Sequence, residues 1–198
     1  MRIIDYKIKY RIPIQIKLCE IINIIKKGEY LNLSAIKALK EYNCPEWVIN
    51  HSEAVTLKAM DISKNLSDNY NLNLEIVEKG AILHDIGRCM TDGIYHAVVG
   101  AHLLKLENYP PEIIKIVERH IGAGIPKKEA ISLGLPAKDF MPLTLEEKIV
   151  AHADNLLHGI KEVNIDFVVD KWSARMGFDH PSIARLREMH KNIVLDHY

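Results

Sequence analysis

The amino-acid sequence predicts an all-α fold. Apolar residues recur three and four positions apart in almost every segment, which is the spacing of one face of a helix. Gly and Pro stand between these segments and mark where helices begin and end. The chain has 198 residues, of which 48% are hydrophobic and 26% are charged, as expected for one medium soluble domain with an appendage.

Residues 1–28 form a predicted basic, amphipathic N-terminal extension. Within it, residues 1–12 alternate loosely and suit a short strand or an arm, and residues 14–27 have helical spacing before the stop signal Gly28. Lys and Arg outnumber Asp and Glu there by seven to two. An Ile-rich helix of this kind more often docks on its own domain or forms a homodimer than binds RNA.

Residues 29–198 are predicted to form the main domain. Its helices are expected, in order, over residues 33–42, 45–66, 74–86, 95–106, 110–120, 145–158, 165–175 and 181–195. Residues 122–143 contain several Gly and Pro breakers and predict a long surface loop with a short helical turn. Thr144 and Glu147 are spaced as a capping box, with a hydroxyl at the N-cap and a carboxylate three residues later.

Composition excludes several classes of function. The net charge is zero, so nothing global indicates a nucleic-acid partner or a membrane surface. The three cysteines, Cys19, Cys44 and Cys89, form no CxxC pair, which argues against a zinc finger or a dithiol redox site and fits a reducing cytoplasm. No apolar run reaches the length of a membrane span, and the N-terminus lacks the pattern of a signal peptide. We therefore expect a cytoplasmic protein.

A histidine and an aspartate, His84 and Asp85, stand side by side at the end of an apolar run over residues 75–83. Such a run is expected to pack into the core, and a buried carboxylate is costly unless another group compensates its charge. A divalent cation would compensate it, and imidazole and carboxylate are ligand types that borderline metals accept. The pair therefore indicates a candidate metal site if other segments supply further ligands.

Four more polar residues interrupt apolar faces on other predicted helices: His51, His96, His120 and Asp154. Taken singly, such a histidine more often donates to a backbone carbonyl, and such an aspartate more often caps a helix or joins an ion pair. Six such residues converging on one core are better explained by a shared polyvalent ion. The remaining histidines are expected to point elsewhere or to lie at helix ends and in the tail: His102, His152, His158, His180, His190 and His197.

The order His51, His84-Asp85 and Asp154 resembles the motif of the HD superfamily of metal-dependent phosphohydrolases, over about residues 45–158. Residues 84–87 read His-Asp-Ile-Gly, as in its HDIG subgroup. Segments 118–125 and 145–155 resemble a family of small archaeal HDIG-domain proteins. They are more distantly similar to the bacterial HD-type hydrolases that split symmetrical diadenosine tetraphosphate. The resemblance implies a helical bundle of the HD type.

The resemblance also implies a ligand set. One divalent ion would be held by His51, His84, Asp85 and Asp154, and Asp85 would bridge to a second ion completed by His96 and His120. Ligands of this kind suit Fe, Mn, Co, Ni or Zn without choosing among them. This sequence departs from many binuclear relatives, because Arg88 stands where they have Lys and Ile121 where they have a second His. Arg does not release a proton near neutral pH, so Arg88 could hold a phosphate but not act as a general acid.

The predicted function is hydrolysis of a phosphoester or phosphoanhydride bond in a nucleotide or related small phosphorylated molecule, with Asp85 and Arg88 as catalytic residues. Arg119 and Lys127 are either further phosphate-binding residues or solvated surface charges. The loop over residues 122–143 is expected to form a wall or lid over the site. Two alternatives stay open: a nucleotide-binding sensor with little turnover, and an RNA- or protein-interaction module that uses residues 1–28.

Overall fold

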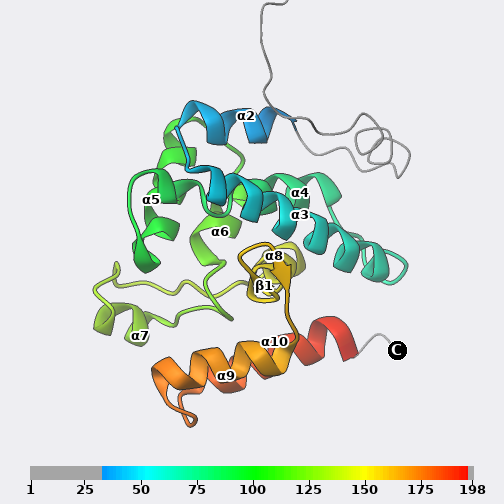
Figure 1. Cartoon of the computed structure of the whole chain (residues 1–198), viewed down its shortest axis with the longest axis vertical. Helices are drawn as coiled ribbons and strands as arrows, with labels where there is room; N and C mark the ends of the chain where they lie inside the picture. Colours follow the sequence, from blue (N-terminus) through cyan, green and yellow to red (C-terminus); the bar gives the residue numbers. More distant parts are fainter. Residues whose placement is uncertain (1–32, 196–198) are drawn as a thin grey trace, which may run out of the picture. The chain divides into compact units, whose positions relative to one another are not determined.

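The computed structural model of the chain describes residues 33–195, and over this range it is mostly helical (Figure 1). The predicted strand or arm over residues 1–12 and the predicted helix over residues 14–27 lie outside the described residues. The boundary between an extension and a main domain at residue 28 therefore stays a prediction. No helix within residues 33–195 combines the length and the apolar character needed to cross a membrane.

The all-α prediction is confirmed for the described residues. The α-helices are α2 (Leu33–Glu41), α3 (Glu46–Leu66), α4 (Leu74–Leu83), α5 (His96–Leu106), α6 (Pro111–Arg119), α7 (Lys127–Ser132), α8 (Leu145–Asn155), α9 (Ile165–Met176) and α10 (Pro181–His190). Short 3-10 helices are η1 (Ile86–Cys89) and η2 (Gly93–Tyr95), and a five-residue π-helix, η3 (Lys191–Leu195), continues α10.

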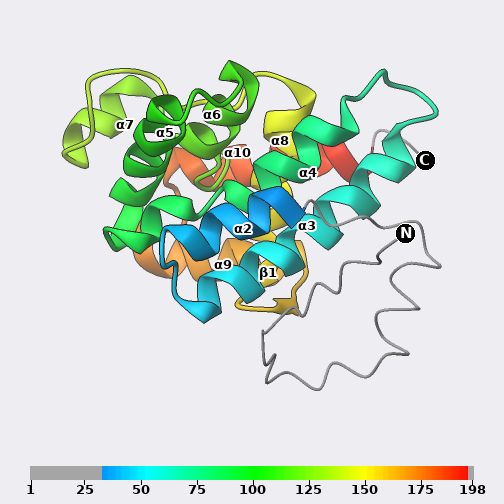
Figure 2. The same cartoon turned by 90° about the horizontal axis from the view of Figure 1, so that it is seen from above.

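The largest group of buried apolar side chains comes mainly from α3, α4, α6, α8, α9 and α10. Helices α3 and α4 lie side by side (Figure 2). Small residues allow close approach: Ala59, Ala81 and Ala153 are fully buried. A Cβ atom on Gly80 would lie 2.5 Å from Cδ1 of Ile116, so α4 and α6 pack closely where Gly80 leaves room. This packing brings the C-terminal ends of α4 and α6 beside the last turn of α8.

The helix predicted to run from residue 74 to residue 86 is shorter than expected. Helix α4 ends at Leu83, and the chain passes through His84 and Asp85 into the 3-10 helix η1. A Cβ atom on Gly87 would lie 2.0 Å from the carbonyl oxygen of His96 and 2.6 Å from the amide nitrogen of Gly100. The chain therefore turns onto the first turn of α5, and only glycine fits at that contact.

The helix predicted to end at residue 158 is also shorter. Helix α8 ends at Asn155, and an antiparallel hairpin follows, with β1 (Leu157–His158) pairing with β2 (Lys161–Glu162). Gly159 has a positive φ of 64°, which permits the tight reversal. The hairpin is a small exception to the all-α prediction.

The capping box at the start of α8 is half confirmed. The hydroxyl oxygen of Thr144 accepts a hydrogen bond from the backbone N–H of Glu147 at 3.2 Å. The carboxylate of Glu147 accepts the backbone N–H of Leu143 at 2.8 Å, one residue before the N-cap, and also binds Arg119. The helix start was predictable from these residue types, but the return bond from Glu147 is not the expected one.

Replacing Gly87 by alanine is expected to lower the free energy of unfolding by about 3 kcal/mol, because its methyl group overlaps the backbone of α5. Gly134→Ala is the matched control. Unlike Gly87, Gly134 has a positive φ, of 75°, but a Cβ atom there meets nothing within 4 Å, so we expect a loss of about 1 kcal/mol from backbone strain alone. Urea denaturation of both variants measures the difference. Equal losses would contradict the close contact between η1 and α5.

Candidate metal centre

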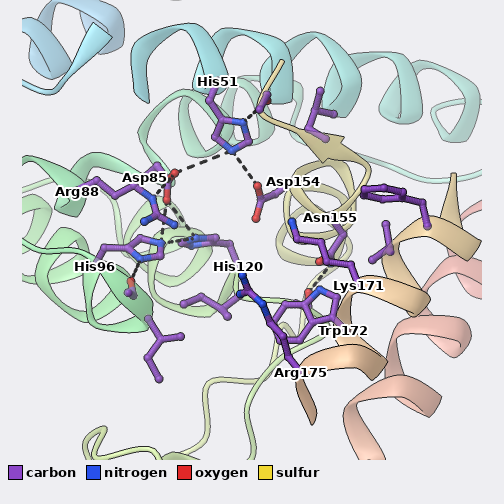
Figure 3. A pocket seen from close by; sticks show the side chains of 18 of the residues that line it. His51, Asp85, Arg88, His96, His120, Asp154, Asn155, Lys171, Trp172 and Arg175 are labelled. Atoms are coloured by element: carbon purple, nitrogen blue, oxygen red, sulfur yellow. Dashed lines mark hydrogen bonds and ion pairs between the residues drawn. The ribbon is translucent and has the colours of Figure 1, made fainter. Parts of the chain in front are cut away.

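The structure brings all six predicted metal ligands into one cluster, which we call the six-residue cluster. Figure 3 labels all of them except His84. They come from several separate helices and from the ends of those helices. His51 lies on α3, His84 and Asp85 join α4 to η1, His96 begins α5, His120 caps the end of α6, and Asp154 lies in the last turn of α8. Four of these side chains are almost fully buried: His84, Asp85, His96 and His120.

The four histidines are oriented in the same way. In each ring Nδ1 donates to a backbone carbonyl oxygen: His51 to Gly159 at 2.7 Å, His84 to Ala81 at 2.7 Å, His120 to Val117 at 2.8 Å and His96 to Gly93. Because Nδ1 carries the proton, the neutral ring presents a lone pair on Nε2. Carbonyl bonds of this kind also orient histidines that ligate metals. All four Nε2 atoms face the two carboxylates of the cluster.

The two oxygens of Asp85 face different histidines. Its Oδ2 lies 4.0 Å from Nε2 of His51 and 3.8 Å from Nε2 of His84. Its Oδ1 lies 2.8 Å from Nε2 of His96 and 3.7 Å from Nε2 of His120. The carboxylate therefore stands between two histidine pairs, with one oxygen for each.

Asp154 lies beside the first histidine pair, His51 and His84. Its Oδ1 lies 3.0 Å from Nε2 of His51 and 3.7 Å from Nε2 of His84. The ligand atoms of His51, His84 and Asp154 lie within 4.8 Å of one another, and so do those of His84, Asp85 and His120. Each group of three donors is compact enough to hold an ion, but the two groups share His84, whose single Nε2 lone pair binds one ion, and neither group includes His96. A second ion would therefore need His96, whose Nε2 lies 2.8 Å from Oδ1 of Asp85.

The donor atoms fit a cation, because several of them are not satisfied by the others. Nε2 of His84 is buried and has no hydrogen-bond partner among the described residues. Nε2 of His96 and Nε2 of His120 lie 3.0 Å apart, and each belongs to a ring whose Nδ1 already donates elsewhere. Two lone pairs that face each other at this distance need a shared proton or a metal ion. The residues therefore suit divalent ions.

In the cluster without metal, burial and the neighbouring charges also shift the pKa values of the ligand side chains. Burial, together with the neighbouring rings of His84 and His96, lowers the pKa of His120 to about 3. Burial opposes ionisation of Asp85, but His84, His96 and His120 hold its pKa well below the usual value. Burial also acts to lower the pKa of His51, yet its bond to Asp154 raises that pKa to about 8. The site thus keeps both carboxylates ionised and His84 and His120 neutral, which is the state in which these groups ligate metals.

Arg88 lies at the edge of the cluster. Its Nε donates to Oδ2 of Asp85 at 2.6 Å, and its guanidinium carbon lies 5.7 Å from the centre of the Trp47 ring. Arg88 also lines the cavity beside the cluster. It is therefore placed to contact both Asp85 and a bound molecule.

A cavity of about 470 Å³ opens onto the six-residue cluster. That volume lies in the range of small-molecule sites. The predicted wall over residues 122–143 is wrong in its main part, because beyond Gly122 none of these residues lines this cavity. They bury Ile125, Ala130, Leu135 and Phe140 against one another in a separate small core. Helix α9 forms the wall instead, through Phe167, Val168, Lys171, Trp172 and Arg175.

The two further basic candidates do not line the cavity. Arg119 donates to both oxygens of the Glu147 carboxylate, at 3.2 and 2.9 Å. Lys127 begins α7, away from the residues that line the cavity. The sequence did not indicate Lys171 and Arg175 as site residues. The spacing of a basic pair on an amphipathic helix does not show which surface the pair faces.

His152 and His190, expected to be ordinary, are paired. Nε2 of His152 and Nδ1 of His190 lie 3.2 Å apart, and His152 is 1% exposed. Burial, with His190 and Lys58 nearby, lowers the pKa of His152 to about 3. His190 lies at the end of α10, as expected, but it is only partly exposed there, and its contact with His152 was not predicted.

Acid is expected to destabilise the metal-free protein below about pH 6.5, the ordinary pKa of histidine. Unfolded His152 takes up a proton there while folded His152 stays neutral until about pH 3, so the unfolded state binds more protons and stability falls as pH falls. His120 acts in the same direction, whereas the raised pKa of His51 favours the folded state at low pH. Each lowered histidine contributes about 1.4 kcal/mol per pH unit.

Urea denaturation between pH 4.5 and 6.5 in the presence of a chelator would measure this slope. His152→Gln should reduce the slope by about one proton, and His102→Gln, on the exposed face of α5, should leave it unchanged. A slope unaffected by His152→Gln would contradict the burial of a neutral imidazole.

Three comparisons relate the chain to known proteins. The model of the HD domain family matches residues 48–158, which contain the whole six-residue cluster. An uncharacterized protein of Methanocaldococcus jannaschii is 50% identical over 153 residues, which are 77% of this chain and 90% of that protein. A tRNA (cytidine(56)-2'-O)-methyltransferase of Thermoplasma volcanium is 42% identical over 153 residues, which are 77% of this chain and 44% of that protein. This chain thus spans less than half of the methyltransferase.

A solved structure shares the fold. The crystal structure of the L. monocytogenes phosphodiesterase PgpH HD domain in complex with cyclic-di-AMP is similar with a TM-score of 0.50. The match covers 82% of this chain and 97% of that domain at 16% sequence identity. At this sequence identity, the similarity supports a shared fold alone.

Proposed function

The chain belongs to the HD domain family, and from that premise we propose that it is a metal-dependent phosphohydrolase. Its substrate would be a phosphoester or phosphoanhydride of a nucleotide or a related small molecule. The observation that carries the proposal is the convergence of four histidine Nε2 atoms and two carboxylates beside a cavity.

The proposed ligands form two sets that share Asp85. His51, His84 and Asp154 would hold one ion with Oδ2 of Asp85, because these atoms lie within 4.0 Å of their neighbours in the set. His96 and His120 would hold the other with Oδ1 of Asp85. When bound, divalent ions would polarise the phosphoryl group and activate the attacking water.

The remaining residues would orient and neutralise the substrate. Arg88 offers the planar fork that matches phosphate oxygens, and its bond to Asp85 fixes where that fork stands. Asn155 donates to the carbonyl oxygens of Gly122 at 2.8 Å and Ala151 at 2.9 Å, and so fixes the chain that follows His120. These contacts hold the cavity floor in place without a ligand.

The test is elemental analysis of anaerobically purified protein, followed by turnover of a monoester, a diester and an anhydride with the metal that is found. We expect about two ions per chain, hydrolysis of at least one substrate class, loss of activity on chelation and recovery on adding the metal back. A metal-loaded chain that binds nucleotides without hydrolysing them would instead support a sensor. A chain that binds no metal would overturn the proposal.

A further inference from the structure

A second group of side chains faces the cavity from α9. Lys171 and Arg175 are four positions apart, so they lie one turn apart on the same face of the helix. Both line the cavity together with Trp172. Figure 3 shows these three side chains across the cavity from Arg88, with Asp154 and Asn155 between.

These two cations have no acidic partner within residues 33–195. Other basic side chains nearby are paired. Arg88, which also lines the cavity, is paired with Asp85 at 2.6 Å. Arg185, which lines a smaller cavity together with Trp172, is paired with Glu129 at 2.6 Å. No ion pair of the described residues includes Lys171 or Arg175. The acidic residues that line the cavity are Asp85 and Asp154, which belong to the six-residue cluster. The α9 side of the cavity thus presents positive charge that the described chain does not neutralise.

Helix α9, which carries these cations, packs against the chain at Gly122. A Cβ atom on Gly122 would lie 3.4 Å from Cη2 and Cζ2 of Trp172, so the indole rests close to the Gly122 backbone. The carbonyl oxygen of Gly122 is held by Asn155, as described above. Trp172 also lines a smaller, mostly apolar cavity of about 90 Å³. The indole therefore lines both cavities and offers an aromatic surface for a base next to the two cations.

We propose that Lys171 and Arg175 bind a second phosphate of the substrate, distinct from the phosphate that is cleaved. This inference rests on the proposed function, in which the metal ions and Arg88 meet the charge of the cleaved phosphate. Lys171 and Arg175 then remain for another anionic group, and phosphate matches their hydrogen-bond donors. The substrate class is a nucleotide with at least two phosphates. These are linked directly, as in a nucleoside diphosphate, or separated by a nucleoside, as in a 5'-phosphorylated dinucleotide.

Equilibrium binding of two matched ligand pairs tests this inference. The pairs are AMP with ADP, and the dinucleoside monophosphate ApA with its 5'-phosphorylated form pApA, so that each pair differs by one phosphate. Both tryptophans of the chain, Trp47 and Trp172, line the cavity, so a change in their fluorescence reports binding. We expect the ligand with the extra phosphate to bind at least about tenfold more tightly in one of the pairs. The pair that shows the preference tells how the two phosphates are linked.

The variant Lys171→Gln/Arg175→Gln should abolish that preference while leaving the weaker ligand of the pair little changed. The matched control is Arg187→Gln/Lys191→Gln, which removes the same charge from two exposed residues four positions apart that do not line the cavity. The control should keep the full preference. If the double variant fails to fold by circular dichroism, the two single variants take its place, each with a partial loss.

Equal affinity within both pairs in the unaltered protein would overturn the inference, as would a preference that survives in the double variant. The titration measures binding of the metal-loaded protein, and the recovered ligands are checked to be intact. For a pair in which a ligand is hydrolysed, the ratio of kcat/KM within the pair takes the place of the ratio of affinities. A phosphate preference without any hydrolysis would therefore count against the proposed function and not against the role of α9. Hydrolysis without a phosphate preference would count against the role of α9 and not against the proposed function.

Discussion

Replacing Asp85 by asparagine is expected to remove most of the bound metal and to lower turnover by about a thousandfold or more. The two oxygens of Asp85 face different histidine pairs, at 2.8 Å from Nε2 of His96 and 3.8 Å from Nε2 of His84. Asparagine keeps the shape of the side chain but has one acceptor oxygen and no negative charge. It cannot serve both ions, so both should be weakened by a single change.

Elemental analysis and initial rates of the same preparations would measure the two effects together. Asp61→Asn is the matched control, because Asp61 lies exposed on α3, away from the cavity, and its replacement should change neither quantity. Circular dichroism should show both variants folded. An Asp85→Asn protein that kept two ions per chain and full activity would refute the shared role of this carboxylate.

The positions of the six-residue cluster were predictable because each residue interrupts a regular apolar face. In the helix of residues 111–119, Ile113, Ile116 and Val117 are buried, and His120 is the next position on that face. Its burial therefore follows from helical spacing. The order of the polar residues, with its resemblance to the HD motif, then suggested that they share one site.

The features that the sequence did not reveal depend on contacts between distant segments. The carbonyl of Gly159, which fixes the His51 ring, is 108 positions away from it and is presented by a hairpin that helical spacing did not predict. Residues 122–143 were predicted to cover the site because they follow His120. They fold instead around Phe140 and Ile125, whose backbones pair with each other. Tertiary packing decided both outcomes, and local pattern carries little information about it.

Replacing His96 by alanine is expected to lower the metal content from about two ions per chain to about one. His96 faces Oδ1 of Asp85 and Nε2 of His120, at 2.8 and 3.0 Å, whereas His51, His84 and Asp154 form a group of donors that does not include it. Loss of His96 should therefore empty one site and leave the other filled. Elemental analysis after gel filtration measures the stoichiometry, and His102→Ala on the exposed face of the same helix is the control.

The double variant His96→Ala/His120→Ala distinguishes a shared ion from two independent roles. If both imidazoles hold the same ion, the second replacement finds that ion already gone, and the double variant should lose no more metal or activity than the single variants. If each histidine acts separately, as a buried residue that supports packing, the losses in stability add and the metal content stays unchanged. The second pattern would mean that the 3.0 Å contact between the two rings is held by a shared proton and that the centre binds one ion.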